Sequence, residues 1–276
     1  MKILKVLFAC GMVFASLFAH KTALADITIT PTRIVFEEGD RFKEVTLVNT
    51  SNEAKTYDIG WQHYRMNDDD GTGAGAATTV TESPTTEFDL SQYVVFTPRR
   101  VTLPPSAKQK IRLALRRPAG VADGEYRAHL QFKALRDDIN EQNESQEKGA
   151  SSAAVKINIS YSIPVMFRAG SPTLAGKIQN VKLQRNPENG MLEALVTIAR
   201  GNDPYGVIGH MYIYDPTGKV IGENGNAHVY PEVPSRTFRV PLIDESNLSG
   251  RNIRIVLRHY DNDKGLIYDE RLVPVQ

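Results

Sequence analysis

Apolar and polar residues alternate with a period of two along nearly the whole chain, and this pattern constrains the fold more than any other feature of the sequence. Such alternation is typical of half-buried β-strands, whose successive side chains point to opposite faces of a sheet. The alternating runs are short, rich in β-branched and aromatic residues, and separated by glycine, proline, asparagine and aspartate. No long stretch shows helical periodicity. The sequence therefore predicts an all-β protein.

The predicted strands form two series, separated by Ala169-Gly170-Ser171-Pro172, a composition that suits a hinge. Each series has the strand content of one immunoglobulin-like sandwich, so we predict two such domains, over residues 26–169 and 172–276. The first series is expected at Ile27–Thr30, Phe42–Asn49, Thr56–Arg65, Tyr93–Phe96, Val101–Leu103, Lys108–Leu115, Glu125–Leu135 and Val155–Phe167. The second series is expected at Ile178–Gln184, Leu192–Ala199, Val207–Tyr214, Lys219–Ile221, His228–Tyr230, Thr237–Val240, Ile253–Tyr260 and Leu266–Val273. Two polar segments, Asn67–Glu87 and Arg136–Ala150, are predicted to be loops.

Residues 1–25 have the pattern of a secretory signal peptide. Met1–Lys5 is positively charged, Val6–Ala19 is largely apolar, and Ala23-Leu24-Ala25 is a small-x-small cleavage site. The apolar stretch is shorter than the ~20 residues that span a bilayer, and no later stretch reaches that length. We therefore expect an exported chain without stable membrane insertion. The one cysteine, Cys10, lies within this segment, so the mature chain is predicted to have no disulfide.

Charge and motifs exclude several function classes. Thirty-three lysines and arginines balance 32 aspartates and glutamates, so no overall field attracts nucleic acid. The histidines lack the spacing of metal ligands, and the sequence has no nucleophile elbow, phosphate-binding loop or dinucleotide fingerprint. We therefore predict no enzymatic activity, no metal, no cofactor and no nucleic-acid partner.

The longest strictly alternating run places five apolar side chains on one face of a predicted strand. These are Val155, Ile157, Ile159, Tyr161 and Ile163. Two interpretations stay open. The run is either an ordinary half-buried strand or an edge strand that recruits a strand from another polypeptide.

Two further segments carry a resemblance to a known family. Arg33 lies within Ile29–Phe36, shortly after the predicted mature start, and residues 97–113 contain Thr-Pro, then Leu-Pro-Pro, then a basic strand. On these residues and the alternating run, the sequence resembles the PapD-like periplasmic chaperones of the chaperone–usher pathway of pilus assembly. The resemblance implies two sandwiches set at an angle around a cleft. It also implies a periplasmic chaperone that binds pilus subunits by donor-strand complementation and delivers them to an outer-membrane usher.

The resemblance also implies roles for individual residues. Arg33 matches the arginine that binds the C-terminal carboxylate of the subunit. The segment 155–167 matches the donor strand, whose apolar row fills the groove of the subunit. Glu125, Arg168 and Asp263 match a charged network that fixes the angle between the domains.

The sequence departs from the family at Pro164, where a lysine usually helps to hold the carboxylate. Proline cannot pair with a carboxylate or donate a backbone hydrogen bond. Arg99, Arg100 and Lys156 are the candidates for a substitute base. Together with the long segment Asn67–Glu87, this departure indicates a divergent branch of the family.

Two other function classes stay open from the sequence. A structural pilus subunit or two-domain surface adhesin would use the same folds, although the first predicted strand begins almost at Asp26 and leaves little N-terminal extension. An exported hydrolase with a sandwich module has no support beyond unassigned carboxylates.

Overall fold

The structure is a computed structural model that describes residues 26–67, 80–84, 88–117, 119–135, 159–173, 175–201, 204–246, 248–261 and 265–275. Every regular element assigned in these residues is a β-strand, which confirms the predicted all-β class. The described residues include no helix with the length and apolar character needed to cross a membrane. The predicted signal peptide lies outside the described residues.

The first sandwich packs a four-stranded sheet against a five-stranded sheet. The four-stranded sheet has the order β1 (Ile27–Thr30), β3 (Phe42–Asn49), β9 (Lys108–Leu115) and β7 (Val94–Thr97). The five-stranded sheet has the order β2 (Ile34–Phe36), β11 (Tyr161–Ala169), β10 (Gly124–Ala134), β4 (Lys55–Gln62) and β8 (Arg100–Leu103). Alternate side chains of both sheets, such as Leu47, Ile111 and Leu130, are buried in one apolar core.

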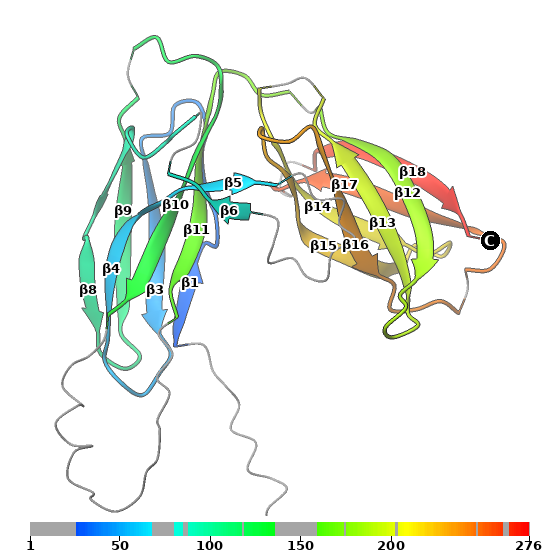
Figure 1. Ribbon diagram of the computed structural model, residues 1–276, viewed down its shortest axis with the longest axis horizontal. Coiled ribbons are helices and arrows are strands. Elements are labelled where there is room, and N and C mark those ends of the chain that lie inside the picture. The colour runs from blue at the N-terminus through cyan, green and yellow to red at the C-terminus, as the bar shows by residue number, and fades with distance from the viewer. Residues whose placement is uncertain are drawn as a thin grey trace, which may run out of the picture.

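The second sandwich repeats this architecture with a three-stranded and a four-stranded sheet. The three-stranded sheet has the order β12 (Lys177–Arg185), β13 (Leu192–Ala199) and β16 (Ser235–Pro241). The four-stranded sheet has the order β15 (Val220–Val229), β14 (Val207–Tyr214), β17 (Asn252–His259) and β18 (Ile267–Pro274). Figure 1 shows the strands of the two sandwiches running in clearly different directions. The fold is therefore two β-sandwiches set at an angle, as predicted.

Most predicted strands match the observed ones, but the predicted strand Thr56–Arg65 is two strands. β4 ends at Gln62, and β5 (Tyr64–Met66) leaves the sheet to pair with β6 (Val80–Glu82). β6 lies in the segment Asn67–Glu87, which was predicted to be a loop. The chain turns at His63, whose ring forms a hydrogen bond with Asp89 (Nε2 to Oδ1, 2.9 Å).

The observed strands β2 and β15 also differ from the predicted strands. β2 (Ile34–Phe36) was not predicted because all three of its residues are buried, so it shows no alternation. β15 was predicted as two short strands because glycine and asparagine occupy its middle. The structure has one strand there, and a shift in its register with β14 accommodates the interruption.

The two sandwiches share buried apolar surface. β5 and β6 lie between them (Figure 1). Three residues of the first part of the chain, Val35, Met66 and Met166, belong to the apolar cluster of the second sandwich. Met66 is 3% exposed, and its sulfur accepts a hydrogen bond from the backbone N–H of Tyr230 (3.4 Å). The two sandwiches are therefore joined by packed apolar side chains as well as by the linker between them.

Candidate functional site

One edge of the first sandwich is only partly covered. β11 pairs with β10 along its whole length, from Tyr161 to Ala169. On its other side it pairs with β2, in parallel, only over Val165–Phe167. Within the part of the chain that the structure describes, no strand pairs with this edge over Tyr161–Pro164. Unpaired backbone groups on a strand edge are a template for another strand.

Arg33 stands where this uncovered edge begins. Ile34 pairs with Val165, so Arg33, one residue earlier in a parallel register, lies level with Pro164. An open cleft of about 580 Å³ extends from this point to the second sandwich. Its walls are formed by Thr32, Arg33, Tyr64, Met66, His129, Ser162, Pro164, Asn226, His228, Tyr230 and Arg236. The cleft therefore joins the free edge of β11 to a set of basic and polar side chains.

No aspartate or glutamate is among the described residues that line this cleft. Arg33 donates a hydrogen bond from Nη2 to Oδ1 of Asn226 (3.3 Å), and its Nε is buried without a hydrogen-bond partner. Among the described residues, no carboxylate oxygen lies within 4.0 Å of its guanidinium. Burial lowers the pKa of Arg33, but an arginine remains cationic at neutral pH. A partly buried cation without a counter-charge favours the binding of an anion.

Two histidines on opposite walls of the cleft are buried and neutral. His129 is 7% exposed and His228 is 3% exposed. Burial, then the charge of Arg127, lowers the pKa of His129 to about 3. Burial, then the charge of Arg33, lowers the pKa of His228 to about 3. The backbone of Asn226 opposes the shift of His228, but neither ring nitrogen of His228 has a partner at hydrogen-bond geometry.

Arg236 provides a second cation on the wall formed by the second sandwich. It lies on β16 and donates a hydrogen bond from Nη1 to the backbone oxygen of His228 (3.3 Å). Its Cζ lies 4.6 Å from the centre of the Phe238 ring. Arg236, His228 and Asn226 were not predicted as site residues. Their short spacing in sequence was visible, but their position opposite Arg33 depends on how the two sandwiches pack.

The predicted network residues Glu125 and Arg168 lie together between the sandwiches. Arg168 Nε is 3.5 Å from Glu125 Oε2, and both side chains are fully buried. Each also contacts Gly206 of the second sandwich. Arg168 Nη2 donates a hydrogen bond to the backbone oxygen of Gly206 (3.0 Å). The backbone N–H of Gly206 donates to Glu125 Oε2 (3.2 Å). A Cβ at residue 206 would lie 2.7 Å from the backbone oxygen of Val229, so this close approach requires glycine. Asp263 lies outside the described residues.

A second buried ion pair beside this network was not predicted. Arg127, 3% exposed, forms a salt bridge with Glu232 of the second sandwich. Its Nη2 also donates to the backbone oxygen of Tyr64 (3.1 Å), and its Cζ lies 3.9 Å from the centre of the Tyr230 ring. These partners are far apart in sequence, so no local pattern indicates the pair.

The structure corrects the predicted substitute bases. β8, which begins at Arg100, is at the opposite edge of the five-stranded sheet from β2. Arg100 is exposed there and donates from Nη2 to Oδ2 of Asp58 (3.0 Å). Arg99 is exposed beside the ring of Phe96. Neither lines the cleft of Arg33. Lys156 lies outside the described residues.

The five predicted groove-filling residues have different surroundings. Val155 and Ile157 lie outside the described residues. Ile159 is 53% exposed and precedes β11, and Tyr161 is partly buried against the core of the first sandwich. Ile163 is 4% exposed within that core, so it has no free surface for a partner, and we do not assign it that role.

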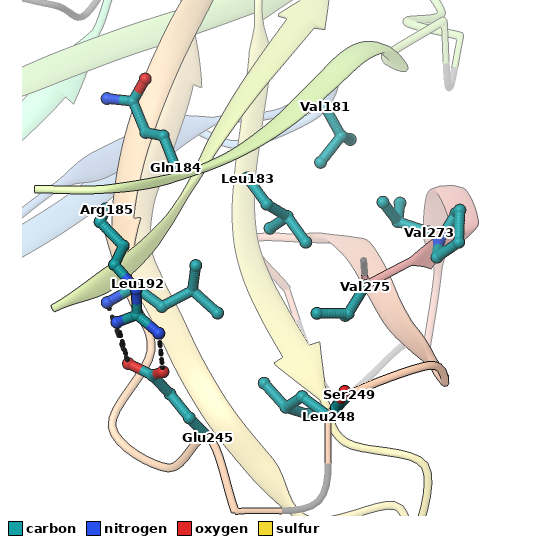
Figure 2. A pocket seen from close by; sticks show the side chains of 11 residues that line it. Val181, Leu183, Gln184, Arg185, Leu192, Glu245, Leu248, Ser249, Val273 and Val275 are labelled. Carbon is teal, nitrogen blue, oxygen red and sulfur yellow. Dashed lines mark hydrogen bonds and ion pairs between the residues drawn. The ribbon is translucent and has the colours of Figure 1, made fainter.

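A separate hollow of about 750 Å³ lies in the second sandwich, between the edge strands β12 and β18. Figure 2 shows apolar side chains such as Leu183, Leu192 and Val275 around it. At one side, Arg185 Nη2 and Glu245 Oε2 form an ion pair at 2.9 Å. The two charged groups that line this hollow therefore neutralise each other, unlike those of the cleft at Arg33.

Comparisons with known proteins give the following likenesses. The chain is similar to the YadV chaperone, with 13% identity over 90% of this chain and 100% of that chain, and a TM-score of 0.46. It is similar to the CupB2 chaperone of Pseudomonas aeruginosa, with 14% identity over 90% and 100% of the two chains, and a TM-score of 0.44. A chain in the structure of the Salmonella enterica SafA pilin with the SafB chaperone is similar at 13% identity over 92% and 98%, with a TM-score of 0.44. No protein-family model and no curated protein matches the sequence.

Proposed function

We propose that this protein is a periplasmic chaperone of pilus subunits, which binds each subunit by donor-strand complementation and delivers it to an outer-membrane usher. One observation carries the proposal: the uncovered edge of β11 begins at Arg33, in a cleft lined by basic residues and by no described carboxylate. A strand that pairs with this edge and ends at Arg33 would satisfy both features. Its backbone would occupy the free edge, and its terminal carboxylate would neutralise the arginine.

The apolar side chains of the donor strand would supply most of the affinity. Burying one large aliphatic side chain stabilises a complex by ~1.5–3 kcal/mol, and the sequence offers Val155, Ile157 and Ile159 for this purpose. One arginine–carboxylate contact contributes ~1.5–3 kcal/mol. Three such side chains therefore outweigh one anchor, although the loss of conformational entropy on binding reduces the total.

Arg33 would mainly fix the register of the incoming strand. A slip of one residue turns every side chain of a strand to the opposite face. A carboxylate held at a fixed point prevents that slip, because the first residue of the pairing is then defined. Arg33 would therefore act as the starting point of pairing between subunit and chaperone.

Co-expression with a pilin encoded beside this chain tests the proposal. We expect a soluble 1:1 complex with the unmodified chain and complex formation weakened by roughly 10- to 100-fold with Arg33→Ala, because one charge-assisted contact is lost. Arg99→Ala is the matched control, since Arg99 is exposed and does not line the cleft. Equal yields of soluble pilin with and without the chaperone would contradict the proposal.

A second variant separates strand pairing from anchoring. Ile159→Asp should abolish the complex, because it places a charge in the apolar row, while leaving the fold intact since Ile159 is exposed. Circular dichroism and the unfolding midpoint check the fold. Normal binding by Ile159→Asp would show that the pilin does not bind this row.

A further inference from the structure

The wall of the cleft opposite Arg33 has its own unsatisfied polar group. His228 is 3% exposed, and both of its ring nitrogens are buried without a hydrogen-bond partner. A buried polar group without a partner is costly, and one that lines an open cleft, as His228 does, can gain a partner from a ligand. A neutral imidazole has one N–H to donate, and a carboxylate oxygen accepts such a bond.

His228 lines the same cleft as two arginines, Arg33 of the first sandwich and Arg236 of the second. The charges of Arg33 and Arg236 both act on its ring, one from each sandwich. Arg236 is held on the same wall as His228 by its hydrogen bond to the backbone oxygen of that residue. Both arginines and His228 line one cleft, in which no described residue is acidic. An anion placed there would meet donors from both sandwiches.

We propose that His228 and Arg236 of the second sandwich complete, with Arg33, a carboxylate site that spans the two domains. This inference rests on the proposed function, because the carboxylate is that of the incoming subunit strand. Arg236 takes the position of second base, because Pro164 lies beside Arg33 in the first sandwich and Arg236 is the other arginine among the described residues that line the cleft. A carboxylate has two oxygens, so it can accept from guanidinium groups on opposite walls.

A site of this kind couples subunit binding to the arrangement of the domains. The carboxylate would be held by Arg33 from the first sandwich and by Arg236 from the second. Because the two donors lie on different sandwiches, a change in the angle between the sandwiches changes the distance between them. The bound subunit would therefore favour the one arrangement in which both arginines reach the carboxylate.

The test uses the full mature chain and a synthetic peptide with the last-strand sequence of a pilin encoded beside it. The peptide is made once with a free C-terminal carboxylate and once as the amide. We expect the unmodified chain to bind the free acid at least ~10-fold more tightly than the amide, and Arg236→Gln to lose most of that preference. Arg236→Lys should retain part of it, because the charge is kept.

Arg254→Gln is the matched control in the same sandwich, since Arg254 pairs with Glu270 outside the cleft. Its preference for the free acid should equal that of the unmodified chain. Unfolding midpoints of all variants establish that the chain is folded.

The possible results separate the two proposals. If Arg236→Gln keeps the full preference for the free acid while Arg33→Gln loses it, the inference about Arg236 is overturned and the proposed function stands. If Arg236→Gln weakens acid and amide equally, its contact is not with the carboxylate, and the inference is again overturned. If the unmodified chain binds neither peptide nor the whole pilin, the proposed function itself fails.

Discussion

Two clusters of buried polar groups lie between the same two sandwiches, and they differ in how their charges are compensated. In the cluster of Glu125, Arg168, Arg127 and Glu232, each arginine has a carboxylate partner from within the chain. In the cleft of Arg33, the nearest polar partner of the arginine is the amide oxygen of Asn226. The charges of the first cluster are paired within the chain, whereas Arg33 has no carboxylate within 4.0 Å among the described residues. The difference separates a part of the interface that holds the fold from a part suited to a ligand.

Breaking the compensated cluster should have the largest effect on stability. Arg168→Met removes the partner of Glu125 and leaves a carboxylate that is 2% exposed without its counter-charge. We expect a loss of ~3–5 kcal/mol in the free energy of unfolding, measured by urea denaturation at neutral pH. The double variant Glu125→Gln with Arg168→Met should recover part of the loss, because no uncompensated charge then remains. A loss below ~1 kcal/mol for Arg168→Met would show that the ion pair of Glu125 and Arg168 does not stabilise the fold more than the cleft of Arg33 does.

Lowering the pH should reduce the free energy of unfolding through the two histidines of the cleft. This effect should be smaller than that of Arg168→Met. The pKa of His129 and of His228 is lowered from 6.5 to about 3 in the folded chain. Between these values the unfolded chain binds more protons, so the contribution to stability is full above pH 6.5 and is lost as the pH falls towards 3. Each histidine lowers the free energy of unfolding by about 1.4 kcal/mol for every pH unit below 6.5.

Urea unfolding at pH 7.5 and pH 5.5 measures this dependence. The double variant His129→Gln with His228→Gln should lose about 1–3 kcal/mol less than the unmodified chain on acidification. The titration of carboxylates is common to both proteins and cancels in the comparison. The same pH dependence in both would show that the histidines are protonated in the folded chain.

Removing the uncompensated cation should have the smallest effect on stability. Arg33→Gln deletes a charge that has no carboxylate within 4.0 Å among the described residues and keeps a polar side chain. We expect the free energy of unfolding to stay within about 0.5–1 kcal/mol of the original, or to rise slightly. Urea denaturation at pH 7.5 measures it beside Arg168→Met. A loss as large as that of Arg168→Met would mean that Arg33 is part of the scaffold.

Periodicity identified the strands that have one buried and one exposed face. β3 (Phe42–Asn49) and β9 (Lys108–Leu115) were predicted with their observed bounds because their side chains alternate between core and solvent. β2 has three buried residues in a row, so its sequence carries no period-two signal. The sequence does mark the break between β4 and β5, although one strand was predicted there. The apolar positions change phase at His63, from Tyr57, Ile59 and Trp61 to Tyr64 and Met66.

The candidate site was only half visible in the sequence. Arg33 was selected through resemblance to a family, and Glu125 and Arg168 were selected in the same way. Arg236 and His228 were not, because their relation to Arg33 depends on contacts between the sandwiches. Asn226, which accepts a hydrogen bond from Arg33, is 193 residues away in the sequence. The candidates Arg99 and Arg100 failed because the order of strands in the sheet, which no local pattern specifies, puts them at the far edge.

Under the proposed function, the short length of β2 has a consequence for the range of subunits that the protein could bind. Hydrogen bonds between strand backbones do not depend on side-chain identity, so an open edge can accept segments of unrelated sequence. β2 covers only three residues of β11, and its start next to Arg33 defines where any added segment must stop. Clients would then be sorted by the position of their last residue relative to their final strand. One chaperone of this design could serve a set of dissimilar subunits that share nothing but that end point.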